Sequence, residues 1–392
     1  MYKIRTYDSI ADRGLERFSR ENFTVGAEVD NPHAMLLRSH KLAAEDLCPG
    51  LRAVARAGAG VNNVPVQACS ELGIVVFNTP GANANSVKEL VLAALLISAR
   101  DIVGGIQFVS SLRDVTDEEE LNRLVEAEKK RFKGRELRGK SLGVVGLGAI
   151  GSLVARAALD LGMEVLGYDP AISVDSAWRL PSEVQRMEDL PSLFARSDYV
   201  TLHVPLIPET VGLINEESLS SFRPGSTLLN FARQPIVASE ALSAALDDGR
   251  VGGYIADFPV PGLTEHPKVR LTPHLGASTD EAEENCAVMA ADLLIEFLSV
   301  GNVRHSVNFP AVSLEPSGGY RLAITNRNVP GMLSQIMSVL AARQINVVDM
   351  INKSREGVAY NLIDIAEEAE PALIDAICGI DNVMNVREFQ IS

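Results

Sequence analysis

The sequence predicts an α/β protein, and three observations support that prediction. Apolar runs of strand length alternate with amphipathic segments of helix length through most of the first 300 residues, which is typical of a parallel sheet wound with helices. A glycine-rich turn at 146–151 joins one of these strands to a helix. The segment 319–392 shows a different order, βαββαβ, which is typical of ferredoxin-like units. We therefore expect an α/β body followed by a separate C-terminal unit.

Length and composition exclude several classes of protein. At roughly 150 residues per domain, the 392 residues suggest two or three domains. The 46% hydrophobic and 22% charged residues exclude a disordered or fibrous chain. A net charge of −15 repels phosphate backbones and anionic bilayers, so we expect neither nucleic acid nor a membrane as a partner. The four cysteines lack metal-ligand spacing, and we expect reduced thiols, no metal site and a cytoplasmic location.

The first part of the chain is expected to form an N-terminal α/β unit. Residues 52–56 and 74–77 are short apolar runs that predict strands, and residues 86–100 predict a long apolar helix. Thr116 and Glu119 have the spacing of a capping box, in which Thr116 would cap a helix that ends near Lys129. The high charge of this segment favours a solvated helix over a binding surface.

Six further runs predict one doubly wound parallel sheet. Each run is short, apolar and bounded by glycine, proline, aspartate or charged residues. They lie at 142–146, 164–168, 199–204, 227–231, 253–256 and 269–271. After a linker at 309–319, we expect strands at 320–325, 346–352, 359–365 and 383–389, with helices at 331–343 and 371–378.

The turn after the first of these six strands has the spacing of a dinucleotide-binding fingerprint. Gly146 permits a tight turn, Gly148 lets the backbone approach a pyrophosphate, and Gly151 lets the helix pack closely on the strand. Backbone amides at the start of that helix, at Ala149 and Ile150, would face the anion. The alternative is an ordinary turn between a strand and a helix.

Asp169 strengthens the interpretation as a nucleotide site. It ends the next strand, 18 residues after Gly151, where an acid that binds the ribose belongs. A 2′-phosphate would meet a like charge at this carboxylate. The sequence therefore predicts NAD rather than NADP as the cofactor.

Several motifs across the chain resemble the D-2-hydroxyacid dehydrogenases. They appear in that family's order and at its approximate spacing. They are Phe132-Lys133-Gly134-Arg135-Glu136-Leu137-Arg138-Gly139-Lys140, Leu202-His203-Val204-Pro205 with Glu209-Thr210, Asn230-Phe231-Ala232-Arg233, and Thr272-Pro273-His274-Leu275-Gly276-Ala277-Ser278-Thr279. The resemblance covers nearly the whole chain and is strongest to the members that act on 3-phosphoglycerate.

The resemblance implies three domains. A flavodoxin-like substrate-binding domain would comprise residues 1–95 and 282–312, and the doubly wound NAD-binding domain at 96–281 would be inserted into it, with the active site in the cleft. Residues 319–392 would form an ACT regulatory domain. The activity implied is oxidation of 3-phosphoglycerate to 3-phosphohydroxypyruvate with NAD, the first step of serine synthesis, by a homo-oligomer.

The resemblance also implies two catalytic residues. Arg233 would bind the substrate carboxylate and carbonyl oxygen, because a planar guanidinium can grip a carboxylate with two hydrogen bonds and polarise a carbonyl. His274 would accept the proton of the substrate hydroxyl, since imidazole in solution titrates near pH 6.5. Ala232, His274 and Gly276 would also line the cofactor site.

The family pattern fails where the acid that partners the histidine normally stands. That position, three residues after Phe258, is Pro261, and the aspartate expected near the nicotinamide is displaced by one residue to Asp257. Without a carboxylate the imidazolium would lose a stabilising charge. Asp257 can act as the histidine's partner or as a nicotinamide contact, Glu265 is an alternative partner, and the site can also work without one.

Substrate anchors are expected in the N-terminal domain. Arg56-Ala57-Gly58 resembles the family's carboxylate-binding loop, in which glycine lets amide groups turn toward an anion. Arg38-Ser39 matches another substrate position, and Asn83 lies in a loop that would face the cleft. Arg38 and Arg56 are the candidates for the phosphate, although either can instead form an ordinary surface ion pair.

The C-terminal segment resembles the ACT module, which binds small amino acids where two such modules pair. Asn326, Asn328 and Asn346 match the positions at which L-serine can bind as an effector. Asparagine supplies the donor and the acceptor that an amino acid needs, although these residues can also serve only to shape turns. Two alternatives to the main function stay open. One is a reductase for another 2-oxo acid, and the other is a non-catalytic protein of this fold that senses NAD(H).

Overall fold

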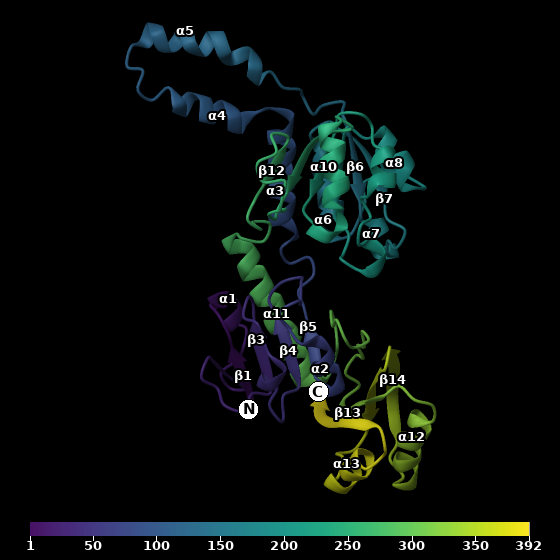
Figure 1. Cartoon of the computed structure of the whole chain (residues 1–392). Coiled ribbons are helices and arrows are strands. Elements are labelled where there is room, and N and C mark those ends of the chain that lie inside the picture. Colours follow the sequence, from purple (N-terminus) through teal and green to yellow (C-terminus); the bar gives the residue numbers. More distant parts are fainter. Residues whose placement is uncertain (392) are drawn as a thin grey trace. The chain divides into compact units, whose positions relative to one another are not determined.

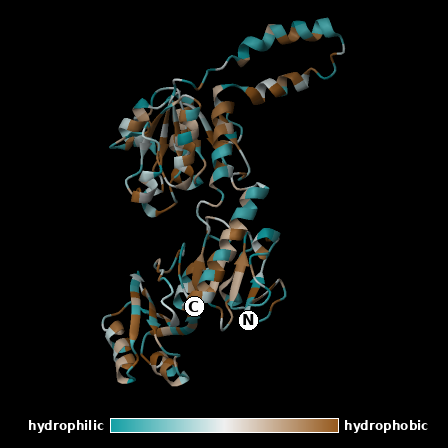
Figure 2. Ribbon diagram, turned by 180° about the vertical axis from the view of Figure 1, so that it is seen from behind, coloured by the Kyte–Doolittle hydropathy of each residue, from teal (hydrophilic) through white to brown (hydrophobic). Residues whose placement is uncertain are grey.

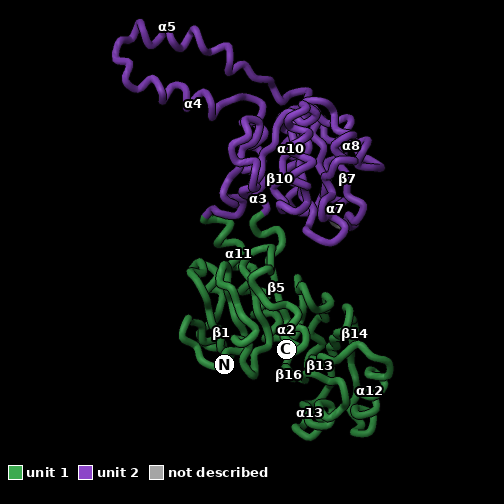
Figure 3. Tube along the Cα trace, in the orientation of Figure 1, with its two compact units in different colours: residues 1–83, 280–392 green, residues 84–279 purple. Residues whose placement is uncertain are grey.

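The structure is a computed structural model that describes residues 1–391, apart from the side chain of Asp175. The chain divides into two compact units (Figure 3). Unit 1 comprises Met1–Asn83 and Asp280–Ser392, and unit 2 comprises Ala84–Thr279. The assignment of separate substrate-binding, NAD-binding and ACT domains within these units stays a prediction.

Unit 1 contains a parallel five-stranded sheet with the flavodoxin-like order β2-β1-β3-β4-β5. Its strands are β1 (Tyr2–Thr6), β2 (Phe23–Gly26), β3 (Ala34–Leu37), β4 (Ala53–Arg56) and β5 (Val75–Phe77). Short helices α1 (Asp12–Leu15), η1 (Ala44–Asp46) and α2 (Val66–Glu71) connect them, and the long helix α11 (Asp280–Val300) packs on the sheet. The return of the chain to this sheet after residue 280 was expected.

The C-terminal part of unit 1 is a four-stranded antiparallel sheet with the order β14-β15-β13-β16. In chain order its elements are β13 (Gly319–Arg327), α12 (Met332–Ala342), β14 (Val347–Arg355), β15 (Val358–Ile365), α13 (Pro371–Cys378) and β16 (Val383–Ile391). This succession is the predicted βαββαβ unit, and we call it the ACT-like sheet (Figure 1).

The two faces of the ACT-like sheet are covered by different helices. Ile324 and Ile363 on one face share a core with residues of α12 and α13. Ala323 and Leu362 on the other face share a core with residues of α11 and of the parallel sheet. The hydroxyl of Tyr360 donates to the carbonyl of Gly301 over 2.7 Å. Helix α11 therefore belongs to one core with both sheets of unit 1.

Unit 2 contains a parallel seven-stranded sheet with the order β12-β11-β10-β9-β6-β7-β8. Its strands are β6 (Ser141–Val145), β7 (Glu164–Tyr168), β8 (Gln185–Arg186), β9 (Tyr199–Leu202), β10 (Ser226–Asn230), β11 (Val251–Ala256) and β12 (Val269–Leu271). All but the two-residue β8 were predicted. The chain crosses from one half of the sheet to the other between β6 and β9, which is where ligands bind in open α/β sheets.

The helices of unit 2 cover the sheet and connect its strands. They are α3 (Ala84–Ala99), α6 (Ala149–Asp160), α7 (Val174–Trp178), α8 (Leu190–Arg196), η3 (Pro208–Thr210), α9 (Glu216–Ser220), η4 (Gln234–Ile236) and α10 (Ser239–Asp247). The strands are mainly hydrophobic in Figure 2, as expected for a parallel sheet covered on both faces. In the described part of the chain, no helix has both the length and the apolar character needed to cross a bilayer.

Two helices, α4 (Ile102–Ser111) and α5 (Glu118–Glu128), form an extension of unit 2 before the short helix η2 (Lys129–Phe132) (Figure 1). Neither α4 nor α5 contains a buried residue, so the predicted solvated helix is confirmed. The predicted cap is wrong by one residue, because Asp117 rather than Thr116 accepts the hydrogen bond from Glu120 N. A carboxylate is favoured there by the positive end of the helix dipole.

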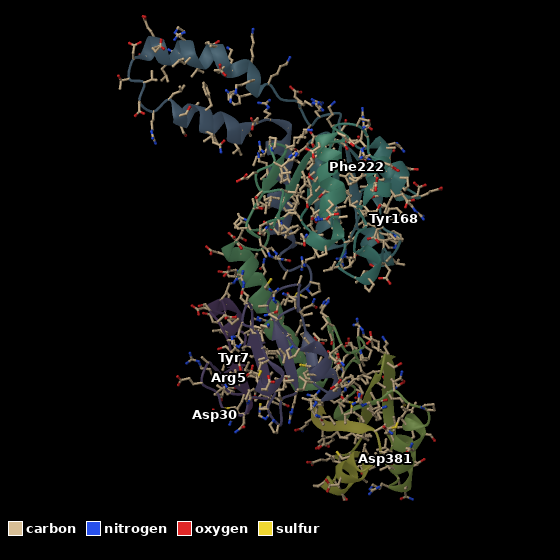
Figure 4. All side chains as sticks on the ribbon, in the orientation of Figure 1. Arg5, Tyr7, Asp30, Tyr168, Phe222 and Asp381 are labelled. Atoms are coloured by element: carbon tan, nitrogen blue, oxygen red, sulfur yellow. The ribbon has the colours of Figure 1, made fainter. Side chains whose placement is uncertain are left out.

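The ion pair between Arg321 and Asp364 is the most deeply buried one in the described residues, with both side chains 0% exposed. The two hydrogen bonds measure 2.6 and 3.0 Å. Replacing Asp364 by alanine leaves a buried cation without a counter-charge, so we expect Asp364→Ala to destabilise the protein by about 3–5 kcal/mol. Urea unfolding followed by circular dichroism measures this loss. The exposed Asp381 (Figure 4) is the control, and an equal effect of Asp381→Ala would contradict the interpretation.

Candidate active site

The candidate active site of unit 2 lies at the carboxyl ends of its parallel strands. Because these strands run in the same direction, the turns that follow them meet at one edge of the sheet. The glycine fingerprint follows β6, and Asp169 follows β7. Arg233, Asp257 and His274 follow β10, β11 and β12.

The glycine turn has the geometry that the fingerprint predicts. Gly146 has a φ of +90°, and a Cβ there would lie 2.6 Å from the carbonyl oxygen of His203. A Cβ on Gly151 would lie 1.9 Å from the carbonyl oxygen of Gly146. A Cβ on Gly148 would meet no atom within 4 Å, and no side chain caps α6, which begins there. The amides at the start of α6 and the space beside Gly148 therefore fit a pyrophosphate.

Asp169 is tied to the same turn. Its carboxylate accepts a hydrogen bond from Leu147 N over 2.8 Å and one from Ala171 N over 3.0 Å. A carboxylate can accept about four hydrogen bonds, so both oxygens retain capacity for ribose hydroxyls. The residues present therefore fit the dinucleotide that the fingerprint predicts.

The turn that carries Arg233 is held by Asn230. This side chain is fully buried at the end of β10 and donates to the carbonyl of Arg233 over 3.0 Å. Its amide oxygen accepts from Ala232 N over 3.1 Å. Arg233 itself is exposed, and its Nη1 donates to the carbonyl of Ala232 over 2.7 Å. Our sequence analysis noted Asn230 only as part of a motif and assigned it no role.

The turn that carries His274 is held by Asp257. This carboxylate is only 3% exposed and accepts from Thr272 Oγ1 over 2.6 Å. It also accepts from Leu275 N over 2.7 Å and from Gly276 N over 2.6 Å. His274 lies between these contacts, exposed and with a φ of +62°. Asp257 thus binds the backbone around the histidine, and its action on the imidazole or the nicotinamide, like that of Glu265, stays a prediction.

The strand register brings the turns of Arg233 and His274 to the same edge of the sheet. Asn230 at the end of β10 aligns with Ala256 at the end of β11, which aligns with Leu271 at the end of β12. Two strand spacings separate β10 from β12, which is about 10 Å. The two turns therefore lie on either side of Asp257.

His203 is a residue of this edge that the sequence analysis left without a role. It follows β9, and its Nε2 lies 2.9 Å from Thr201 Oγ1, while its Nδ1 is buried without a hydrogen-bond partner among the described atoms. Burial lowers the pKa of His203 to about 3. Its place directly after an apolar run that predicts a strand was the signal available in the sequence.

In unit 1, several of the predicted substrate residues lie together after β3 and β4. Arg56 Nε donates to the carbonyl of Arg38 over 3.1 Å, and Ala57 N donates to the carbonyl of Leu37 over 2.8 Å. A Cβ on Gly58 would overlap the guanidinium of Arg56, 1.7 Å from Nη1. Ser39 belongs to the same segment. Asn83 is half-buried just before α3, and no contact described for it links it to these residues.

Comparison with known proteins agrees with this arrangement. Residues 106–276 match the family model described as D-isomer specific 2-hydroxyacid dehydrogenase, NAD binding domain. A D-3-phosphoglycerate dehydrogenase of Dictyostelium discoideum is 30% identical over an alignment of 413 positions, gaps included, which covers 98% of this chain and 96% of the relative. The chain belongs to the D-2-hydroxyacid dehydrogenase family. A D-3-phosphoglycerate dehydrogenase of Haemophilus influenzae is 32% identical over 375 residues, covering 92% of this chain and 87% of the relative.

Solved structures extend the comparison to the cofactor. The NAD⁺-bound 3-phosphoglycerate dehydrogenase of Entamoeba histolytica matches with a TM-score of 0.60 at 25% identity, covering 78% of this chain and 98% of the other. This protein is therefore an NAD-dependent D-2-hydroxyacid dehydrogenase, with the α/β fold of its family and NAD as its cofactor.

The ACT-like sheet of this dehydrogenase does not bring the three predicted effector residues together within one copy of the chain. Asn326 is 2% exposed near the end of β13, where it accepts from Asn361 Nδ2 over 2.8 Å. Asn328 follows β13 and donates to the carbonyl of Glu356. Asn346 precedes β14, whose first residue aligns with Ile365 and so with Tyr320 at the beginning of β13. The six residue steps from Tyr320 to Asn326 span about 20 Å.

The glycines of the fingerprint give a matched pair of variants. Gly148→Ala places a methyl group in open space, so we expect stability within about 0.5 kcal/mol of wild type. The same methyl occupies the space for the pyrophosphate, so the Kd for NADH should rise roughly tenfold or more. Gly151→Ala overlaps the backbone and should cost about 3 kcal/mol or more. Thermal unfolding and NADH fluorescence titration measure both, and unchanged NADH affinity of Gly148→Ala would refute the assignment.

His203 gives a prediction about pH. Its pKa is about 3 in the folded protein, and an unfolded histidine titrates near 6.5, so acidification protonates the unfolded state first. The stability contributed by neutral His203 is thus present above pH 6.5 and is lost as the pH falls below it, by about 2 kcal/mol at pH 5. Urea unfolding at pH 7.5 and pH 5 should show a smaller acid loss for His203→Gln than for wild type. The exposed His305 is the control, and His305→Asn should keep the wild-type loss.

Proposed function

We propose that this dehydrogenase oxidises 3-phosphoglycerate to 3-phosphohydroxypyruvate. The observation that supports the proposal most is that the turns of Arg233 and His274 lie on either side of Asp257. They lie at the same edge of the sheet as the glycine turn that leads into α6. Its relatives in Dictyostelium and Haemophilus, which the chain spans almost fully, carry the name D-3-phosphoglycerate dehydrogenase. The βαββαβ order of the C-terminal sheet supports an ACT domain.

In this proposal Arg233 binds and polarises the substrate. Its guanidinium forms hydrogen bonds with the carboxylate and with the oxygen that becomes a carbonyl. Since Asn230 fixes the backbone of this turn through Ala232 N and the carbonyl of Arg233, the point from which the Arg233 side chain extends is set before substrate arrives. NAD accepts the hydride from C2 of the acid when it is bound.

His274 removes the hydroxyl proton as that hydride leaves. The imidazole is exposed, and its backbone conformation is fixed by the neighbouring hydrogen bonds to Asp257. A positioned base of this kind contributes about 10²–10⁴-fold to the rate. The carboxylate of Asp257 then acts on catalysis through the turn that it holds.

The phosphate of the substrate is assigned to Arg38 and Arg56. One observation favours a second candidate, a dehydrogenase for an unphosphorylated 2-hydroxy acid, namely that Arg38 Nη1 lies 2.6 Å from Glu283 Oε2. This carboxylate offsets the charge that would attract a phosphate. If the substrate is 3-phosphoglycerate, its phosphate carries more charge than a carboxylate and replaces Glu283 as the partner of Arg38.

The remaining assignments of the proposal concern regulation and assembly. We assign L-serine as an effector to Asn326, Asn328 and Asn346, and we propose a homo-oligomer in the cytoplasm. Asn346 lies at the opposite end of the ACT-like sheet from the other two. A complete effector site would therefore need residues from two copies of the sheet.

Turnover of purified protein tests the function. The protein is incubated with NAD and 3-phosphoglycerate, NADH is followed by absorbance, and a trap for phosphohydroxypyruvate draws the reaction forward. Turnover of 3-phosphoglycerate supports the proposal. Faster reaction with unphosphorylated acids supports the second candidate. Tight NADH binding without turnover of any acid would overturn both.

Two variants test the assigned roles. Arg233→Ala and His274→Ala should each lower kcat/KM by roughly 10²–10⁴-fold, because each removes a group that acts on the substrate during the reaction. The Kd for NADH should stay within about twofold of wild type. The half-buried Arg250, which pairs with Asp248 at the opposite end of β11, is the control. Near-normal activity of either variant would show that its residue does not take part in the reaction.

A further inference from the structure

Asp8, which follows β1, makes an unusual set of contacts in unit 1. Its Oδ2 accepts hydrogen bonds from three consecutive backbone amides, those of Arg38, Ser39 and His40, over 3.3, 2.9 and 2.7 Å. Consecutive N–H groups that converge in this way form a concave site for an anion. In this structure the anion is a carboxylate of the protein itself.

The same segment is fixed from its carbonyl side. Asn63 Nδ2 donates to the carbonyl of Arg38 over 3.0 Å and to that of His40 over 2.7 Å. Arg56 Nε donates to the carbonyl of Arg38 over 3.1 Å. The contacts of Asp8 therefore fix the backbone at Arg38, whose carbonyl is also the acceptor for Arg56.

Side-chain packing adds to the constraint. The ring of Tyr7, next to Asp8, stacks on the ring of His40 with a centroid distance of 4.3 Å and an interplanar angle of 16°. The Arg5 guanidinium lies 5.1 Å from the centre of the Tyr7 ring, and both residues are labelled in Figure 4. The end of β1 thus holds the segment 38–40 through a carboxylate and a ring.

Asp8 is charged under working conditions and adopts a costly backbone conformation. Burial opposes ionisation, but the three amides outweigh it and hold the pKa of Asp8 below its usual value. Its φ is +63°, in the left-handed region that non-glycine residues seldom adopt. The hydrogen bonds to 38–40 offset that strain, as expected of a residue with a positioning role.

We propose that Asp8 is a positioning residue for substrate binding, which preforms the segment 38–40 and, through the Arg38 carbonyl, the orientation of Arg56. The inference rests on the proposed function, because that function makes Arg38, Ser39 and Arg56 the substrate anchors. Without the carboxylate, three amides lose their acceptor and the segment gains conformational freedom. Substrate binding must then also order the segment 38–40, which weakens the affinity for substrate. The hydride transfer at the Arg233 and His274 turns is unchanged.

Steady-state kinetics of the full-length protein tests this inference. Asp8→Ala should raise KM for the acid substrate about tenfold while kcat and the KM for NAD stay within about twofold. Asp8→Asn should give an intermediate KM, because its amide oxygen still accepts hydrogen bonds but carries no charge. An unchanged KM for the acid, or an equal loss in kcat and in the KM for NAD, would overturn the proposal.

Asp189 supplies the matched control. Its carboxylate also accepts a backbone amide, that of Ser192 over 2.7 Å, but it caps α8 in unit 2. Asp189→Ala should leave all three kinetic constants within about twofold of wild type. A rise in the acid KM equal to that of Asp8→Ala would mean that lost amide contacts act through general destabilisation.

Hydrogen exchange separates this inference from the proposed function. In the protein without substrate, Asp8→Ala should speed exchange of the Ser39 and His40 amides at least about tenfold, and Asp189→Ala should not. Unchanged exchange would refute the positioning role whatever the substrate is. If wild type instead oxidises only unphosphorylated acids, the proposed function fails, and the Asp8 comparison is made on the acid that it does oxidise.

Discussion

The hydrogen bonds that Asp257 accepts are the interaction on which the rest of the candidate site depends. His274 adopts a φ of +62°, a conformation that costs roughly 1–3 kcal/mol in a non-glycine residue. Three short hydrogen bonds from the surrounding turn go to one buried carboxylate, and charged acceptors of this kind form strong bonds. They hold the turn in a shape that it would not keep alone. The position of the histidine therefore follows from an aspartate at the end of the neighbouring strand.

The same arrangement recurs elsewhere in the chain. Asp169 follows β7 and binds the turn after β6, and Asp8 follows β1 and binds the segment after β3. In each case the aspartate ends one parallel strand and accepts amides from the loop of the adjacent strand. Parallel strands place their carboxyl ends at one edge, so such an aspartate reaches the next loop without a long side chain. The loops to which we assign cofactor and substrate are thus each shaped by a carboxylate of the protein.

Local patterns were enough to predict most of the fold. Most strands of the seven-stranded sheet are short, mainly apolar runs, and Gly146, Gly148 and Gly151 act within a single turn, so their geometry is encoded locally. The role of Asp257 was not predictable in the same way. Its partners lie 15 to 19 residues later, and no spacing rule indicates which amides converge on it. The buried pair of Arg321 and Asp364 spans 43 residues and leaves no local signal.

Helix α11 contacts two distant parts of unit 1, one near each of its ends. Its first turn carries Glu283, which pairs with Arg38, and its last turns carry Phe297, whose ring lies 4.0 Å from the guanidinium of Arg387 on the ACT-like sheet. The 21 residues of this helix span about 30 Å, so one helix contacts both parts of unit 1. Control by an effector needs two states with different affinities for it, and helix α11 is an element that contacts both the ACT-like sheet and Arg38.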